Sequence, residues 1–475
     1  MRPLTLTEVA RMSGGTLHGA DASIDTVATD TRRLPAAGKA LFVALSGENH
    51  DAHDHLDVSV ADRVAGLLVS RPVQAGLPEV RVADTRLALA QLAGAIQRGR
   101  ATRVVAITGS NGKTSVKTLL LSVLAEAFDR VYGNPGNYNN EIGLPLAVLD
   151  APEDAEVGVY EMGAGKPGDI AYLTRIAMPY AALVNNVAPA HVERMGSLLA
   201  IADTKAAVYD ALPRDGVAVI NADDAFAPFF AERAHGRRLL RFGLEASADL
   251  TARDLRMAPG GSEFVLATPA GDAPVVLSLR GRHNVRNALA AAALAVGLGV
   301  PIDAIARGLA AARPVEGRLV ARRLGEAAVL IDDSYNANPG SLAAAIDTLA
   351  EGQGEGWLVL GDMRELGADA EAMHAEAGRR ARAAGITRLF ALGPLSAAAA
   401  QAFGQGGVVL DSHDEVAGAV RNALRTAGAA TAATGEIRVL VKGSRGSAMD
   451  KVVRALLADV PGPGGQELGG TDDAA

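Results

Sequence analysis

Short apolar runs alternate with amphipathic patterns along most of the chain. The runs LFVAL and GLLVS lie within residues 1–100, and VVAI, VGVYEM, AALVNNV and GVAVINADD follow between residues 101 and 313. After Arg313-Pro314 a further set begins, with AAVLIDDS, GWLVLGDM, RLFALG and IRVLVKGS. Runs of this length separated by helical segments indicate βαβ units and parallel sheets.

The pattern predicts an α/β protein of three domains, since 475 residues exceed what one hydrophobic core holds. We expect a small N-terminal α/β domain over residues 1–100. A central domain of P-loop type with a mostly parallel sheet should cover residues 101–313, and a Rossmann-like domain residues 314–460. The Gly/Pro-rich tail 461–475 has almost nothing to bury and is expected to be disordered.

Composition narrows the function classes. The chain is 49% hydrophobic and 21% charged, and its net charge of −8 argues against general nucleic-acid binding. Cysteine is absent, which excludes disulfides and thiolate chemistry. The N-terminal segment has no apolar core of a secretory signal, and the apolar run 288–300 is too short to span a bilayer. We expect a cytoplasmic protein without membrane insertion.

Residues 104–117, VVAITGSNGKTSVK, carry the strongest local signal. An apolar run is followed by a glycine loop and then by a helical stripe, in which apolar residues recur from Val116 to Ala127. This order points backbone N–H groups and a helix N-terminus at an anion. Lys113 would reach phosphates and Thr114 would hold Mg²⁺. The alternative is an ordinary strand-to-helix turn, since Ile107 stands where the common P-loop has its first glycine.

Polar residues follow each apolar run. Ligands bind at the carboxyl ends of parallel strands, so these residues are candidates for one site with hard oxygen ligands and cations. They are Ser110, Asn111, Lys113, Thr114, Glu161, Asn185, Asn186, His191, Asn221, Asp223, Asp332, Asp333, Asp362, Lys442 and Arg445. The set is what a Mg²⁺-nucleotide site needs.

A series of motifs then resembles the Mur ligase family of ATP-dependent amide-bond ligases. In chain order they are TGSNGKTSVK, YEMGA, NNVAPAHVERMGS, ADTKAAVYD, VINADD, GRHNVRNALAA, EGR and DDSYNANPGS. The resemblance covers residues 5 to about 455. The family loop is the shorter G-x-x-G-K-[ST], so Gly109 is its first glycine and no glycine is missing.

The resemblance implies a reaction in which ATP phosphorylates a carboxylate and an amine then attacks the acyl phosphate. DDSYNANPGS, LGDMRELG and VKGSRGSAMD are similar to the member that joins D-Ala-D-Ala to UDP-N-acetylmuramoyl-tripeptide, and TDTRRLPAAGKALF is similar to a UDP-sugar-binding domain. The alternatives are the ligase that adds the third residue of the peptide, a folylpolyglutamate synthetase-like ligase, and a plain P-loop ATPase. The identity of the third residue, diaminopimelate or lysine, stays open, and we expect a monomer.

The resemblance also implies roles for single residues, with ATP and two Mg²⁺ ions as cofactors. Nucleotide binding is assigned to Gly109, Ser110, Asn111, Gly112, Lys113, Thr114, Ser115, Asn287, Arg318 and Asp333. Metal binding is assigned to Thr114, Glu161, His191 and Lys205, the lysine as a carbamate, and catalysis to Lys113, Lys205 and His191. Substrate binding is assigned to Thr31, Arg32, Asn336, Lys442 and Arg445.

Plainer interpretations stand beside these assignments. Glu161 could be an exposed strand-end carboxylate, Lys205 a helix-surface lysine and His191 a loop cap. A polar cluster of histidines and aspartates lies further upstream and lacks the spacing of a closed metal site, so we do not assign it a metal. Its members are His50, Asp51, His53, Asp54, His55 and Asp57, of which His53 is expected near the nucleotide sugar.

Overall fold

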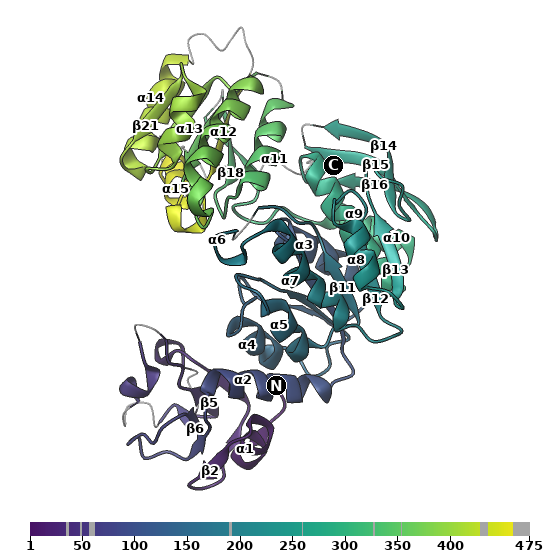
Figure 1. The fold of residues 1–475 in the computed structure, drawn as a ribbon, viewed down its shortest axis with the longest axis vertical. Coiled ribbons are helices and arrows are strands. Elements are labelled where there is room, and N and C mark those ends of the chain that lie inside the picture. Colours follow the sequence, from purple (N-terminus) through teal and green to yellow (C-terminus); the bar gives the residue numbers. More distant parts are fainter. Residues whose placement is uncertain are drawn as a thin grey trace, which may run out of the picture.

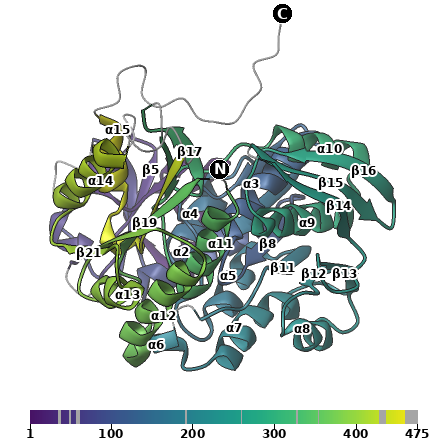
Figure 2. The same cartoon turned by 90° about the horizontal axis from the view of Figure 1, so that it is seen from above.

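The computed structural model describes residues 1–34, 38–47, 50–56, 62–189, 192–258, 260–325, 328–352, 354–427 and 436–458. His191, Asp57 and the tail 461–475 therefore lie outside the described residues. Figure 1 shows three lobes in chain order, and both end lobes lie on the same side of the central one. Viewed from above, the C-terminal lobe lies over the N-terminal lobe (Figure 2). The prediction of a three-domain α/β fold is confirmed.

The N-terminal lobe is built on a five-stranded sheet of order β2-β7-β6-β5-β4. Its strands are parallel except for β2, which pairs antiparallel with β7. The side chain of Thr5 accepts a hydrogen bond from Glu8 in a capping box, and this starts the first helix. The elements are β1 (Leu4–Thr5), α1 (Leu6–Ser13), β2 (Thr16–His18), β3 (Ser23–Ile24), β4 (Thr26–Ala28), η1 (Thr31–Arg33), β5 (Ala40–Val43), η2 (Ala52–His55), β6 (Val64–Val69) and β7 (Glu79–Arg81).

Helix α2 (Thr85–Arg98) joins the first two lobes (Figure 1). It packs on α1 on one side and on α4 and α5 of the central lobe on the other. One hydrophobic cluster consequently runs from the N-terminal lobe into the central lobe. After the helix, the buried guanidinium of Arg100 donates to the carbonyls of Val148 (2.6 Å) and Ala151 (2.9 Å), which ties the junction to the end of α4.

The central lobe holds a six-stranded parallel sheet of order β13-β12-β11-β8-β10-β9. Successive residues of β8 face opposite sides, so Val105 and Ile107 pack with α3 and α9 while Val104 and Ala106 pack toward α4, α5 and α7. The elements are β8 (Arg103–Thr108), α3 (Lys113–Leu124), β9 (Val131–Gly133), α4 (Gly143–Asp150), β10 (Val157–Glu161), α5 (Asp169–Ala177), β11 (Ala181–Val184), α6 (Val192–Met195), α7 (Leu198–Asp210), β12 (Val217–Asn221), α8 (Ala227–Arg233), β13 (Arg238–Phe242), α9 (Arg282–Gly297) and α10 (Ile302–Ala311).

Two features of the central lobe differ from the sequence prediction. An antiparallel sheet of β14 (Thr251–Ala258), β15 (Gly261–Thr268) and β16 (Gly271–Leu277) covers one side of the core, where only βαβ units were expected. Helix α3 ends at Leu124, so the expected stripe that reached Ala127 is too long. The N–H of Ala127 bonds to the carbonyl of Leu124, three residues back, and the side chain is exposed beyond the last helical turn.

The C-terminal lobe has a six-stranded sheet of order β17-β18-β22-β19-β20-β21, parallel except for the edge strand β17. Helices α11, α12 and α13 cover one face, and α14 and α15 the other. The elements are β17 (Val320–Arg323), β18 (Ala328–Asp333), α11 (Pro339–Ala350), β19 (Glu355–Gly361), η4 (Gly367–Asp369), α12 (Ala370–Ala383), β20 (Arg388–Leu392), α13 (Ser396–Phe403), β21 (Gly407–Leu410), α14 (His413–Ala427), β22 (Ile437–Lys442), η6 (Arg445–Ser447) and α15 (Asp450–Ala458). Among all these helices of the described chain, none is long and apolar enough to cross a bilayer.

Candidate active site

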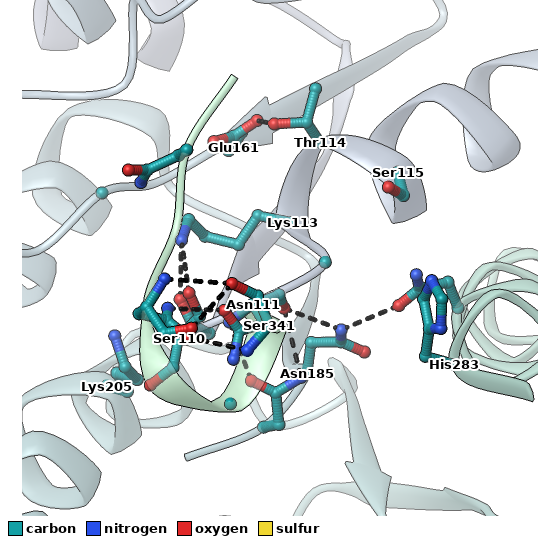
Figure 3. A pocket seen from close by; sticks show the side chains of 18 of the residues that line it. Ser110, Asn111, Lys113, Thr114, Ser115, Glu161, Asn185, Lys205, His283 and Ser341 are labelled. Carbon is teal, nitrogen blue, oxygen red and sulfur yellow. Dashed lines mark hydrogen bonds between the residues drawn. The ribbon is translucent and has the colours of Figure 1, made fainter. Parts of the chain in front are cut away.

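A cleft of about 1260 Å³ opens where the carboxyl ends of the central strands meet the C-terminal lobe. Its lining includes the whole loop 109–112 with Lys113, Thr114 and Ser115 at the start of α3. The central lobe adds Glu161, Asn185, Lys205, Asn221 and Asn287, and the C-terminal lobe adds Arg318, Asp333, Asn336, Lys442 and Arg445. The sequence thus predicted much of one continuous surface, part of which Figure 3 draws.

The loop between β8 and α3 is shaped by two glycines. Gly109 has a φ of +148° and Gly112 a φ of +78°, backbone angles that residues other than glycine rarely adopt. A Cβ on Gly112 would lie 2.5 Å from both Asn185 Nδ2 and Asn287 Oδ1. The tight turn leaves the N-terminus of α3 facing the cleft without a side-chain cap, as an anion site requires.

Asparagine side chains hold this loop from behind. The N–H of Asn111 donates to Asn186 Oδ1 (2.8 Å), and Asn185 Nδ2 donates to the carbonyl of Asn111 (3.0 Å). Asn185 Nδ2 also donates to Asn287 Oδ1 (3.1 Å), which links the loop to α9 (Figure 3). The loop is therefore positioned by buried amides before any ligand binds.

Thr114 lies at the centre of the hydrogen bonds between the two lobes. Its hydroxyl donates to Glu161 Oε2 (2.7 Å; Figure 3) and accepts from Arg318 Nη2 (2.9 Å). Lys113 Nζ donates to the carbonyl of Gly109 (2.7 Å), so its ammonium lies folded over the loop. A hydroxyl and a carboxylate oxygen at this spacing, with two cations beside them, form a donor set suited to a metal-bound phosphate.

The C-terminal lobe also contacts the loop directly. Asn338, the N-cap of α11, donates from Nδ2 to Asn111 Oδ1 (2.6 Å). The ring of Tyr335 lies 4.5 Å from the guanidinium carbon of Arg318 and 5.7 Å from that of Arg445. These contacts hold Arg318 at Thr114 and bring the start of α11 to the mouth of the loop.

Lys442 is paired within the C-terminal lobe. Its buried ammonium donates to Asp333 Oδ2 (2.5 Å) and to the carbonyl of Asn336 (3.0 Å). Lys442, which the resemblance assigned to substrate binding, therefore has an internal carboxylate as its ion-pair partner in this structure. Arg445 keeps an exposed guanidinium at the cleft, and its N–H donates to Asn336 Oδ1 (3.3 Å).

Lys205 on α7 is buried, with 3% of its surface exposed. Its ammonium has no hydrogen-bond or ion-pair partner among the described residues, although it lines the cleft. Burial, and secondarily the positive charge of Lys113, lowers the pKa of Lys205 to about 7. The interpretation as a helix-surface lysine is wrong, since the side chain points inward beside the loop (Figure 3).

His283 lies on the far side of the loop, on α9. Burial lowers its pKa to about 4, and the charges of Lys442 and Arg286 act in the same direction. The ring is therefore neutral at pH 7 and can accept or donate hydrogen bonds at the cleft wall.

Several predicted residues lie elsewhere. Asp332 accepts from the N–H of Ser334 (3.1 Å), and Asp362 accepts from the N–H of Ser396 (2.7 Å), so both cap loops of the C-terminal lobe outside the cleft. Asp223 lines the cleft, but its carboxylate accepts the N–H groups of residues 244–246. Thr31 and Arg32 are in the N-terminal lobe and do not line the cleft.

The histidine cluster of the N-terminal lobe is a structural network. His53 is buried. Its Nδ1 lies 2.6 Å from Asp51 Oδ1, and its Nε2 accepts a hydrogen bond from the backbone N–H of Ser70 (2.9 Å). The bond accepted at Nε2 places a ring proton on Nδ1. The backbone N–H of His53, which donates to Asp51 Oδ1 (3.0 Å), and secondarily its ring hold the pKa of Asp51 well below its usual range. Within the described ranges, no group of three histidine or acidic side chains could hold a metal ion.

Sequence reasoning missed the residues that surround Glu161 on its other side. Lys117 Nζ lies 3.8 Å from Glu161 Oε2 and donates to the carbonyl of Asn134 (2.7 Å). Asn139 Nδ2 donates to Glu161 Oε1 (2.9 Å). Lys117 follows Lys113 by four residues on one helix, which was a readable signal, whereas nothing in the sequence ties residues 134–139 to Glu161.

Comparisons with known proteins agree with this geometry. Residues 107–295 match the Mur ligase middle domain, and residues 317–445 match the Mur ligase glutamate ligase domain. The UDP-N-acetylmuramoyl-tripeptide–D-alanyl-D-alanine ligase of Escherichia coli is 43% identical over 96% of this chain and 99% of its own. A crystal structure of MurF from Acinetobacter baumannii superposes with a TM-score of 0.90 at 31% identity, covering 96% of this chain and 99% of that one. MurF ligase from Thermotoga maritima in complex with ADP gives 0.80 at 26% identity, covering 91% and 96%. The chain belongs to the Mur ligase family.

Proposed function

We propose that the protein is the ATP-dependent ligase that joins D-alanyl-D-alanine to UDP-N-acetylmuramoyl-tripeptide. The products would be UDP-N-acetylmuramoyl-pentapeptide, ADP and phosphate. The observation that carries the proposal is the meeting of two lobes on one phosphate loop, where Arg318 and Asn338 bond to Thr114 and Asn111. The E. coli relative, aligned over nearly the full length of both chains, supports the choice of substrates.

The charges of the cleft suit a reaction that brings two anions together. Lys113, Lys205 and Arg318 line it from two lobes, and Glu161 lies among them. In the first step a carboxylate oxygen of the tripeptide attacks the γ-phosphorus of ATP, and ADP leaves. In the second step the amine of the dipeptide attacks the carbonyl carbon, phosphate leaves and the amine loses a proton. Fixed cations stabilise the charge that accumulates in both steps.

The donor set of Thr114 and Glu161 fits a Mg²⁺ ion. Both offer hard oxygen atoms, and the 2.7 Å between them is a hydrogen bond that a metal would replace. Held by Thr114 and Glu161, the ion would supply positive charge that stabilises the phosphate groups of ATP. For a second Mg²⁺ we propose His191, which lies outside the described residues, and Lys205 as a carbamate.

The state of Lys205 supports the carbamate proposal. An amine must be neutral to react with CO₂, and a pKa of about 7 leaves much of Lys205 neutral under ordinary conditions. The carbamate would convert this buried amine into an anion with two oxygen atoms. Such a group complements the surrounding lysines and can bind a hard metal ion.

The proposed substrate contacts come from the C-terminal and N-terminal lobes. We propose that Asn336 and Arg445 lie at the dipeptide, with Arg445 available for its carboxylate, and that Thr31 and Arg32 contact the nucleotide sugar. Asn287 and Asp333 would complete the nucleotide site.

We propose that the three domains cover residues 1–100, 101–313 and 314–460. We also propose that the protein is a monomer.

A substrate panel tests the proposal. ADP release is measured with UDP-tripeptide carrying diaminopimelate or lysine, each with and without D-Ala-D-Ala. A second series supplies UDP-N-acetylmuramoyl-dipeptide with free diaminopimelate or lysine as acceptor. We expect ADP release only with a tripeptide and D-Ala-D-Ala together. Release in the second series would assign the chain to the preceding ligase, and release without any amine would favour a plain ATPase.

A further inference from the structure

Lys117 is a buried lysine that the reaction described above does not use. It lies on α3 one helical turn after Lys113, with 6% of its surface exposed, and it is not part of the cleft lining. Lysine is almost never buried to this extent without a partner. Its ammonium donates to the carbonyl of Asn134 (2.7 Å) and lies 3.8 Å from Glu161 Oε2.

Asn134 connects this ammonium to the main chain of Glu161. Its Oδ1 accepts from the N–H of Glu161 (2.9 Å), and its Nδ2 donates to the carbonyl of Glu161 (3.1 Å). The side-chain amide thus pairs with both backbone groups of the last residue of β10. Because its own carbonyl accepts from Lys117, α3, the β9–α4 loop and the end of β10 are fixed to one another.

The carboxylate of Glu161 is therefore held from three directions. Asn139 donates to Oε1, Thr114 donates to Oε2, and Lys117, which does not line the cleft, places its ammonium 3.8 Å from Oε2. Glu161 itself is 4% exposed, so few alternative positions are open to its carboxylate. A carboxylate fixed in this way faces Thr114 before any metal arrives.

We propose that Lys117, acting with Asn134, is a positioning residue that fixes the Glu161 carboxylate for metal binding. The inference rests on the proposed function, since it takes Glu161 as a ligand of Mg²⁺. Outer partners of metal ligands orient the ligand, and their loss costs about 10–100-fold in metal affinity in other sites. Lys117 would reach the metal only through Glu161 and would not touch either substrate.

The direction in which metal affinity changes when Lys117 is neutralised distinguishes a positioning role from an effect of its charge alone. A positive charge near a metal repels it, so an account based on charge alone expects tighter metal binding once Lys117 is neutralised. Positioning expects weaker binding, because Asn134 loses its donor and the carboxylate loses its fixed orientation. The two accounts therefore predict opposite changes from the same substitution.

The test measures Mn²⁺ binding to the enzyme–ADP complex by electron paramagnetic resonance, together with the Mg²⁺ concentration that gives half-maximal ligase activity. We expect Lys117→Met to weaken Mn²⁺ binding about 10-fold or more and to raise the half-maximal Mg²⁺ concentration by a similar factor. Turnover at saturating Mg²⁺ should fall much less. Lys117→Gln keeps an N–H donor for Asn134 and should lose only about threefold.

Lys451→Met is the matched control, since Lys451 is exposed on α15, and it should behave as wild type. Unchanged or tighter Mn²⁺ binding in Lys117→Met overturns the inference. If that variant does not fold, Lys117→Gln decides, and Mn²⁺ affinity equal to that of wild type overturns it. Failure of the proposed function is a separate result, because wild type would then show no Mg²⁺-dependent activity with tripeptide and D-Ala-D-Ala.

Discussion

Replacing Gly112 by alanine should weaken nucleotide binding far more than the same substitution at a positive-φ glycine with free space around it. Gly112 has a φ of +78°, and alanine in this region costs about 1 kcal/mol. The new Cβ would also lie 2.5 Å from Asn185 Nδ2 and from Asn287 Oδ1, more than 1 Å inside ordinary contact. The two amides would have to separate.

The cost follows from the bonds that are lost. Asn185 Nδ2 would give up its hydrogen bonds to Asn287 Oδ1 (3.1 Å) and to the carbonyl of Asn111 (3.0 Å). At about 1 kcal/mol each, these add to the backbone strain to give roughly 3 kcal/mol. If the loop must recover its shape to bind phosphate, the dissociation constant for ADP should rise on the order of 10²-fold.

Calorimetric titration of ADP in the presence of Mg²⁺ measures this directly. Gly299→Ala is the matched control, because Gly299 has a φ of +84° and no atom within 4 Å of the added Cβ. It should bear the backbone strain and keep the affinity for ADP. If Gly112→Ala binds ADP within threefold of wild type, or if Gly299→Ala loses as much affinity, the close contacts of Gly112 do not control nucleotide binding.

Three further predictions address single side chains. Lys113→Ala should lower turnover about 10²-fold or more, because a fixed charge at the transferring phosphoryl group is removed; near-normal turnover at saturating ATP would exclude that role. Lys205→Ala should lose most activity and regain part of it with added acetate, while Lys205→Arg should be no better than Ala; full activity in the arginine variant would exclude a carbamate. His283 should titrate near pH 4 by NMR, in a resonance that Lys205→Ala keeps and His283→Gln loses. Because the pKa of an unfolded histidine is about 6.5, the fold should lose stability as the pH falls from 6.5 to 4, and this loss should be smaller in His283→Gln.

The phosphate loop could be predicted because all of its determinants are local. Strand, glycines, Lys113 and helix follow one another within residues 103–124, and the structure has them in that order. The end of α3 was placed too far along because apolar spacing continues past Leu124, while the backbone already turns through shorter bonds. A local sequence pattern predicts that a helix is present more reliably than it predicts the residue at which the helix ends.

The strand-end rule found the site but could not choose between neighbouring residues. Successive residues of a strand point to opposite faces, so Asp333 reaches the cleft while Asp332 caps its own loop. Lys442 also lies at the right strand end, yet it pairs with Asp333, which no single-strand pattern indicates. Pairing across strands depends on tertiary contacts.

The sequence did not predict the antiparallel sheet β14–β16 or the residues that hold Glu161, because neither follows from the spacing of apolar residues. Buried and exposed residues alternate in β16 but not in β14, so the segment 251–277 carries no sustained strand pattern. Asn134 and Asn139 lie in the loop between β9 and α4 and bond to Glu161 at the end of β10. No periodic pattern in the sequence predicts that this loop reaches Glu161. Residues that support a site from loops carry little signal in a single sequence.

In the proposed reaction a tripeptide carboxylate becomes an acyl phosphate, which D-Ala-D-Ala then attacks. The direct measurement uses UDP-N-acetylmuramoyl-tripeptide labelled with ¹⁸O in the carboxylate that is joined. Wild-type protein is incubated with this substrate, MgATP and D-Ala-D-Ala, and both products are analysed by mass spectrometry. We expect pentapeptide and phosphate in equal amounts, with one ¹⁸O atom from each labelled carboxylate transferred to phosphate. Unlabelled phosphate, or phosphate released without pentapeptide, would contradict this mechanism.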